Sequence, residues 1–246
     1  LPLFRPEELE SQRAYAAIDH QTTTPRSPLD YDARRMVAAY YAQIELIDDQ
    51  LGRILDALDE SGQRDNTIVI FMSDHGEMLG DHGLLLKGCR FYEGVVRVPL
   101  IMSWPGHFAQ GLWSDALVEL TDVVPTLLSC VGLPIPERVM GRSLLPILTQ
   151  RADPSSHRDF VRCEYHDALA LEHASHANMI VDERYKLVVY HGQDLGELYD
   201  LQEDPHEFEN LWDDPAHAEI RFTLMKRLFD AVMQATDPGQ PRVGRF

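Results

Sequence analysis

The chain has 246 residues and a net charge of -18, with 44% hydrophobic and 25% charged residues, as in ordinary globular proteins. Such an acidic chain repels nucleic-acid backbones and anionic lipids, so we expect neither nucleic acid nor membrane as a partner. No run of about 18 apolar residues occurs, so no membrane-spanning helix is expected. Cys89, Cys130 and Cys163 form no disulfide or zinc pattern, which favours a reducing compartment.

The first part of the chain predicts a loop and then a long helix. Residues 1–30 are polar and interrupted by prolines, so we expect an irregular segment with a short helix around residues 6–17. Residues 32–61 predict a long amphipathic helix with one buried stripe, because apolar side chains recur at three- and four-residue steps. The stripe consists of Met36, Tyr40, Ile44, Ile47, Leu51, Ile54 and Leu58.

Two apolar runs then predict strands of a sheet. Residues 67–72 are largely β-branched, which is typical of a strand buried on both faces, as in a parallel sheet. Residues 98–104 predict a second buried strand, and residues 121–131 and 141–148 predict short helices. We therefore interpret residues 1–150 as part of an α/β domain with a mixed, mainly parallel sheet flanked by helices.

The remaining residues, 151–246, predict a small α+β subdomain that starts with a polar linker at 151–158. Four short strand-like runs separated by turn residues predict an antiparallel sheet. They cover residues 160–165, 177–182, 185–190 and 197–201. The amphipathic segment 216–233 predicts a helix that covers this sheet, and the last dozen residues are expected to fray.

Chemically useful side chains follow the first predicted strand. Asp74 and His75 come directly after it, where ligands gather in open α/β sheets, and Gly76 permits a turn that aims both at one ion. Lys87 follows thirteen residues after Asp74, and its ammonium group is suited to bind a tetrahedral anion beside that ion. Taken singly, each residue has an ordinary structural explanation, as a cap, a satisfied histidine or a solvated lysine. Their clustering favours a site.

This region resembles a known family. The stretch NTIVIFMSDHGEMLGDHG at 66–83, followed by Lys87, FYE at 91–93 and RVPLI at 97–101, closely resembles the sulfatase family of the alkaline phosphatase superfamily. Later segments resemble its C-terminal landmarks and extend the similarity over about residues 36–212. They are GRSLL at 141–145, ELYDL at 197–201, EDP at 203–205 and NL at 210–211.

The resemblance implies roles for particular residues. Asp74 and His75 correspond to two metal ligands of the family, and Lys87 corresponds to the lysine that contacts the sulfate. His82 lies near the site in this motif and is a second catalytic candidate, whereas Glu93 and Arg97 are expected to hold the loop. The implied cofactor is a divalent metal, with Ca²⁺ favoured and Mn²⁺ as the alternative, since oxygen ligands dominate such sites. The implied partner is a small-molecule sulfate ester.

Other family features are missing from the sequence. Sulfatases use a formylglycine nucleophile made within a Cys/Ser-x-Pro-x-Arg motif, and none of the three cysteines begins such a motif. Thr24-Pro25-Arg26 lacks both the reactive residue and the spacing, and the paired N-terminal acidic ligands are absent too. We therefore expect the chain to be a C-terminal part that is inactive alone and whose partner is the missing N-terminal half.

Two alternatives remain open from the sequence. A hydrolase of phosphonate monoesters or phosphodiesters shares this fold and much of this motif, so its substrate would be a phosphonate ester. A non-catalytic interaction module is the second alternative. The sequence also leaves a homo-oligomer open, because a sheet with an exposed edge can associate.

Overall fold

The computed structural model describes residues 2–15, 18, 25–166 and 175–235. Its mixed α/β class confirms the expected fold class. A short helix α1 (Glu8–Ala14) and a 3₁₀ turn η1 (Pro28–Asp30) precede the long helix α2 (Ala33–Glu60). The carboxylate of Asp32 accepts a hydrogen bond from Arg35 N at 3.0 Å and caps α2, and Gly62 adopts the left-handed conformation just after its end.

Strands β1 (Val69–Met72) and β2 (Leu100–Ser103) form a two-stranded antiparallel pair, with Val69 opposite Ser103. The expectation of a mainly parallel sheet is therefore wrong for the described residues, whose strand pairs are all antiparallel. An apolar run indicates burial and does not encode strand direction, which explains the difference. Burial on both faces is also not observed, because Met72 and Ile101 are exposed.

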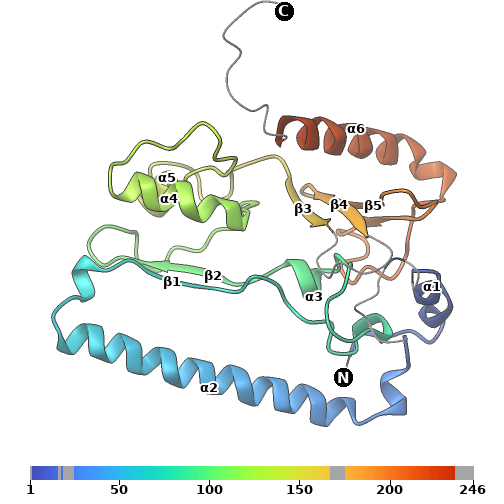
Figure 1. Cartoon of the computed structure of the whole chain (residues 1–246), viewed down its shortest axis with the longest axis horizontal. Coiled ribbons are helices and arrows are strands. Elements are labelled where there is room, and N and C mark those ends of the chain that lie inside the picture. The colour runs from blue at the N-terminus through green and yellow to red at the C-terminus, as the bar shows by residue number, and fades with distance from the viewer. Residues whose placement is uncertain (1, 16–17, 19–24, 167–174, 236–246) are drawn as a thin grey trace, which may run out of the picture.

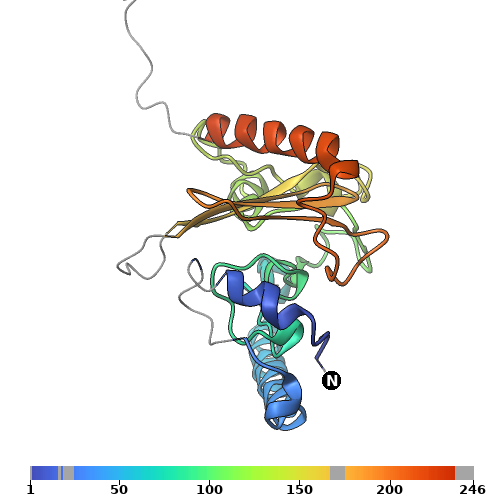
Figure 2. The same ribbon diagram turned by 90° about the vertical axis from the view of Figure 1, so that its right-hand side faces the viewer.

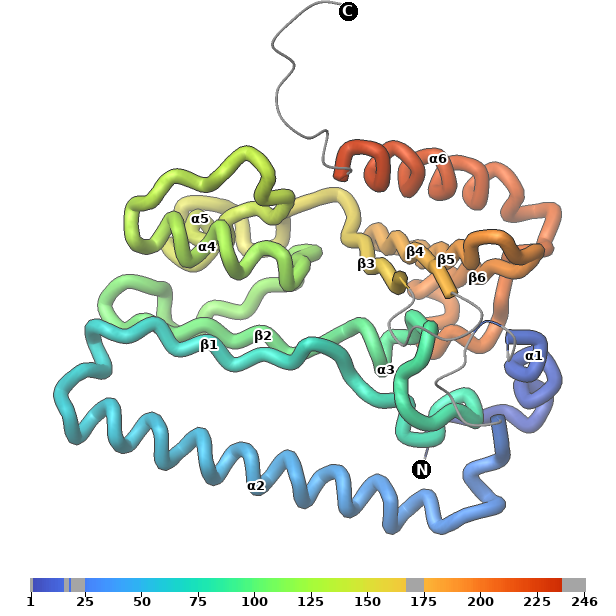
Figure 3. The backbone as a smooth tube through the Cα atoms, in the orientation of Figure 1, coloured from blue at the N-terminus to red at the C-terminus, as the bar shows by residue number. Residues whose placement is uncertain are grey.

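Between and after these strands the chain forms short helical elements. They are η2 (Arg64–Asn66), η3 (Asp81–Gly83), α3 (Glu93–Val96), η4 (Leu120–Asp122), α4 (Val123–Cys130) and α5 (Leu145–Leu148). The helices expected at 121–131 and 141–148 correspond to α4 and α5, whereas α3 was not expected within the loop that precedes β2. This short helix lies beside the loop after β1, as Figures 1 and 3 show.

The C-terminal region contains the expected antiparallel sheet and helix. Strands β3 (Val161–His166), β4 (His176–Val181), β5 (Tyr185–Tyr190) and β6 (Gly196–Asp200) lie in that order, each antiparallel to its neighbour. A 3₁₀ turn, η5 (Pro215–His217), leads into α6 (Ala218–Ala235), which covers one face of the sheet (Figure 2).

Both faces of this sheet are buried. On one face Ile180 and Leu187 pack with Leu224 and Leu228 of α6. On the opposite face Met179, Val181 and Val188 pack with Tyr15, Cys89 and Phe91 from the first half of the chain. Alternate side chains of a strand point to opposite faces, so the side chains of this second face pack against the loop that follows β1.

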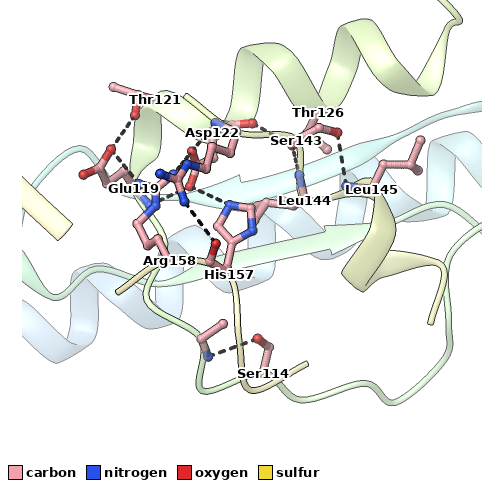
Figure 4. Close-up of polar contacts among 12 residues, drawn as sticks. Ser114, Glu119, Thr121, Asp122, Thr126, Ser143, Leu144, Leu145, His157 and Arg158 are labelled. Carbon is pink, nitrogen blue, oxygen red and sulfur yellow. Dashed lines mark hydrogen bonds and ion pairs between the residues drawn. The ribbon is translucent and has the colours of Figure 1, made fainter. Parts of the chain in front are cut away.

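Buried charged residues join the segment before α4 to the chain that enters the four-stranded sheet (Figure 4). Asp122 is fully buried and pairs with Arg158, whose Nη1 lies 2.6 Å from Glu119 Oε2. Asp122 also accepts a hydrogen bond from Arg142 N at 2.7 Å. Part of the segment expected to be a linker is thus fixed in place, and the division of the chain at residue 150 stays a prediction.

Helix α2 is less covered than its sequence indicates. Its apolar stripe forms at the expected spacing, but Ile44, Ile47 and Ile54 are exposed. The helix runs along one border of the molecule, away from the four-stranded sheet (Figures 1 and 2). Within the part of the chain that the structure describes, no helix combines the length and apolar character needed to cross a bilayer.

Candidate active site

The three residues that the motif singles out come together at the end of β1. Lys87 Nζ lies 2.6 Å from His75 Nε2, and His75 Nε2 lies 3.6 Å from Asp74 Oδ2. Lys87 reaches this position because the chain from 77 to 87 folds back on itself, with Met78 N donating to Leu86 O at 3.0 Å. The result is an acidic, an imidazole and an ammonium group at one point on the surface.

The hydrogen bonds of His75 fix which of its ring nitrogens has a free electron pair. Its Nδ1 lies 2.8 Å from Gly76 O, a carbonyl that can only accept, so Nδ1 carries the proton. Nε2 then has the lone pair that accepts a hydrogen bond from the ammonium of Lys87. A histidine held in this way, by its other nitrogen and a backbone carbonyl, is oriented to offer Nε2 to a cation.

Asp74 faces solvent, with 83% of its side chain exposed. Its Oδ1 accepts a hydrogen bond from His75 N at 3.0 Å. This backbone bond is the largest cause of the lowered pKa of Asp74, and the nearby His75 and Lys87 lower it further. The carboxylate is therefore ionised at neutral pH and has its second oxygen, Oδ2, turned toward the imidazole.

Glu77 holds the segment that carries Lys87. Its Oε1 accepts hydrogen bonds from Leu86 N at 2.5 Å and from Leu79 N at 3.4 Å. Leu86 has a φ of 65° and Gly88 a φ of 54°, so the backbone on both sides of Lys87 is left-handed. Two such residues reverse the chain sharply, and the carboxylate of Glu77 stabilises this reversal.

Helix α3 supports the backbone that follows His75. Gly76 N donates to Val95 O at 2.8 Å, and Glu77 N donates to Gly94 O at 3.1 Å. A Cβ atom at Gly76 would lie 2.0 Å from Gly94 O, so only glycine permits this close approach. The position of α3 therefore sets the position of His75 and, through Glu77, that of Lys87.

Asp74 and His75 suit a divalent cation in their chemistry but are too few to hold one. An ionised carboxylate oxygen and an imidazole lone pair 3.6 Å apart can meet one ion. Among the described residues no group of three or more histidine, cysteine, aspartate or glutamate side chains is arranged to bind a metal. The pair therefore fits part of a metal site, whose further ligands would have to come from elsewhere.

His82, the second catalytic candidate, lies apart from these three side chains. Its ring is buried, with Nδ1 2.5 Å from Glu8 Oε1 and its plane stacked on Tyr92 at 4.0 Å between ring centroids. Its backbone is left-handed, with a φ of 55°, and its N–H donates to Leu3 O at 2.7 Å. These contacts attach α1 and the N-terminal segment to the loop, and a catalytic role for His82 stays a prediction.

Sequence reasoning missed some of the residues that shape the site. Glu8 pairs with His82, and Lys186 of β5 forms ion pairs with Glu93 and Glu207. A lysine within the apolar run of β5 was a signal that a buried partner exists, although the sequence does not identify that partner. Glu93 was expected to hold the loop. Its backbone N–H bonds Glu207 Oε2 at 2.7 Å, which ties the start of α3 to the C-terminal region.

Comparison with known proteins gives this arrangement a family. The family model described as Sulfatase matches residues 6–133, and that described as N-sulphoglucosamine sulphohydrolase, C-terminal, matches residues 80–234. The first of these matches alone covers more than half of the sequence. The chain belongs to the sulfatase family.

Individual relatives agree with this. The arylsulfatase of Clostridium perfringens is 37% identical over 202 residues, which cover 79% of this chain and 40% of that enzyme. The phosphonate monoester hydrolase of Silicibacter pomeroyi superposes with a TM-score of 0.84 at 28% identity, over 97% of this chain and 51% of its own. A structure solved with its substrate, D-glucosamine-2-N,6-O-disulfate, gives a TM-score of 0.71 at 30% identity. The match covers 81% of this chain and 41% of that protein. The chain thus spans about half of these relatives or less.

Proposed function

We propose that this chain supplies one side of the metal- and sulfate-binding site of a sulfuric ester hydrolase. In this proposal Asp74 and His75 are metal ligands, and Lys87 binds the sulfate group. The observation that carries it is the 2.6 Å contact between Lys87 Nζ and His75 Nε2 at the end of β1. The arylsulfatase relative and the relative solved with a disulfated glucosamine support a sulfate ester as the substrate class.

The chemistry follows from the charges of these groups. A divalent cation, with Ca²⁺ preferred and Mn²⁺ as the alternative, would act as a Lewis acid toward the sulfate oxygens. The ionised carboxylate of Asp74 and the oriented Nε2 of His75 would hold that cation, and Lys87 would then release Nε2, because the imidazole has only one lone pair to give. The ammonium of Lys87 would donate hydrogen bonds to a sulfate oxygen and stabilise negative charge on the leaving oxygen.

The nucleophile and the remaining ligands are proposed to come from a segment outside these 246 residues. The chain spans 40% of the arylsulfatase that it matches, and its described residues offer only a pair of adjacent ligands. The exposed apolar side chains of Ile44, Ile47 and Ile101 are consistent with further chain packing against α2 and β2. By family resemblance that segment would carry the formylglycine, so we expect no turnover of an aryl sulfate by this chain alone.

Binding to the chain itself tests the site without turnover. Titration with inorganic sulfate should shift the imidazole NMR signals of His75, which contacts Lys87, and Lys87→Ala should weaken sulfate binding by about tenfold, as expected for loss of a charged hydrogen bond. Lys226→Ala is the matched control, since Lys226 is an exposed lysine on α6 that pairs with Asp230. Equal sulfate binding by wild type and Lys87→Ala would remove Lys87 from the site.

Turnover belongs to a longer protein that joins this chain to the remaining family segment. There Lys87→Ala should lower kcat/KM for an aryl sulfate by about 100-fold, a typical loss for one group that stabilises transition-state charge. Unchanged kcat and KM would contradict the proposal. Turnover by the 246-residue chain alone would show that it contains its own nucleophile.

A second candidate is a phosphonate monoester hydrolase. The structural similarity to the Silicibacter pomeroyi enzyme, with a TM-score of 0.84, favours keeping it. Tetrahedral sulfate and phosphonate groups present similar oxygens to Lys87, so the geometry of these residues does not separate them. Rates of the longer protein on an aryl sulfate and on the matching aryl phosphonate monoester decide between the two.

A further inference from the structure

A buried lysine of the C-terminal sheet makes three hydrogen bonds with the region around α3. The side chain of Lys186, on β5, is fully buried. Its Nζ donates to Phe91 O at 2.9 Å, to Glu93 Oε1 at 2.6 Å and to Glu207 Oε1 at 2.6 Å. An ammonium group has three donors, so every one of them is used. We call Lys186, Glu93 and Glu207 the Lys186 triad.

Glu207 connects this lysine to the start of α3. Its second oxygen, Oε2, accepts a hydrogen bond from Glu93 N at 2.7 Å, at the first residue of the helix. Burial raises the pKa of Glu207, and the ammonium of Lys186 is the largest influence that opposes this rise. Glu207 also has a left-handed backbone, with a φ of 58°, which a non-glycine residue adopts only when its surroundings hold it.

The triad continues into the candidate active site. Helix α3 accepts the hydrogen bonds of Gly76 N and Glu77 N, the two residues that follow His75. The side chain of Glu77 holds Leu86 N, next to Lys87. A continuous set of hydrogen bonds therefore runs from β5, through Glu207 and α3, to the backbone beside His75 and to the backbone beside Lys87.

Stability alone is a poor explanation for a buried lysine with two carboxylates. Removing the charged groups of Lys186 and Glu207 from water costs several kcal/mol per ion, and apolar side chains of similar volume are often as stable or more so. What a buried, fully hydrogen-bonded ammonium provides is a single geometry, because each donor must meet its acceptor. The fixed distances of the triad set where α3 lies relative to the sheet.

We infer that Lys186 and Glu207 are positioning residues, which hold α3 so that His75 and Lys87 lie side by side at the sulfate site. This inference rests on the proposed function for the role of the site. The geometric part, that the triad controls the backbone at Gly76 and Glu77, is independent of which ester is bound. The two parts can therefore be tested separately.

The test uses Lys186→Met in the 246-residue chain, with Lys226→Met as the control. Methionine has a similar length and no donors, and Lys226 is the exposed lysine of α6. We expect amide hydrogen exchange at Gly76 and Glu77 to become about tenfold faster, while amides in β4 and β5 keep their protection. The ¹⁵N signals of the His75 ring should also lose the signature of a single tautomer, and Lys226→Met should change neither measurement.

The outcomes separate positioning from stability and from the proposed function. Equal acceleration of exchange over the whole chain, or unchanged exchange at Gly76 and Glu77, would overturn the inference. If Lys186→Met does not fold, Glu93→Gln decides by the same two measurements, since it weakens the link at α3 and leaves the Lys186–Glu207 pair in place. If Lys87→Ala leaves kcat and KM of the longer protein unchanged but the selective exchange effect is present, the proposed function fails and the positioning by the triad stands.

Discussion

At Gly76 the backbone passes so close to α3 that an added methyl group has no room. A Cβ there would lie 2.0 Å from the carbonyl oxygen of Gly94, which is backbone and cannot rotate away. We predict that Gly76→Ala lowers the free energy of unfolding by about 1–3 kcal/mol, the range for overpacking of a filled site. Because the backbone must shift beside His75, sulfate binding should weaken as well.

Gly52 provides the control for this substitution. It lies within α2, and a Cβ added there would meet no atom within 4 Å beyond the backbone of its own helix, so alanine fits without a clash. Gly52→Ala should raise the free energy of unfolding by about 0.5–1 kcal/mol, because alanine favours the helix, and should leave sulfate binding unchanged. Urea unfolding of both variants checks this. Equal stability of Gly76→Ala and wild type would show that α3 moves aside easily.

Glu197 is a buried carboxyl group away from the site, and its titration should be visible in the stability of the fold. It lies on β6, accepts a hydrogen bond from Tyr190 Oη at 3.3 Å and has Arg90 Nη1 at 3.7 Å from its Oε1. Burial raises the pKa of Glu197 to about 7 from its ordinary value of 4.5, and the charge of Arg90 opposes this only in part. The folded state therefore binds this proton more tightly than the unfolded state does.

The sign of the pH dependence follows from this difference in proton binding. The contribution of Glu197 is fully present below its ordinary pKa of 4.5 and is lost as the pH rises through about 7. Glu197→Gln cannot titrate, so wild type should lose stability relative to this variant, on the order of 3 kcal/mol, between those pH values. Urea unfolding at several pH values measures the difference, and a constant difference would place the pKa of Glu197 near its ordinary value.

At the scale of elements, local pattern was sufficient for the helices and strands that repeat a clear period. The three- and four-residue spacing predicted α2 within one residue at each end, since it was expected over 32–61 and spans Ala33–Glu60. The four strands of the C-terminal sheet and α6 were also predicted in order, because short apolar runs alternate there with turn residues. In these segments the local residue pattern alone is enough to predict the helix or strand.

Elements that depend on distant partners could not be predicted in this way. Helix α3 is four residues long and is held by Glu207, more than a hundred positions later in the chain. The antiparallel direction of β1 and β2 depends on the path of the chain between them. At the candidate site the sequence singled out Asp74, His75 and Lys87 from one motif, whereas the roles of Lys186 and Glu207 in holding it required the three-dimensional contacts.

The whole molecule combines a well-covered region with a sparsely covered one. The four-stranded sheet is packed on both faces, by α6 and by residues near α1 and α3. The β1–β2 pair and α2 expose large apolar side chains, of which Ile101 is 61% exposed and Ile54 is 59% exposed. Apolar area left in water promotes association with any surface that can cover it. The sparsely covered region should therefore determine whether the isolated chain self-associates in solution.

We predict that the exposed stripe of α2 promotes self-association of the isolated chain. Substituting Ile44→Glu together with Ile54→Glu should reduce the associated fraction in sedimentation velocity, because charges would then face one another across the contact. The free energy of unfolding should change by less than about 0.5 kcal/mol, since both side chains are already exposed. Leu29→Glu is the control, because Leu29 is a large exposed apolar residue that lies outside the stripe. If Leu29→Glu reduces association equally, the effect comes from net charge and not from α2.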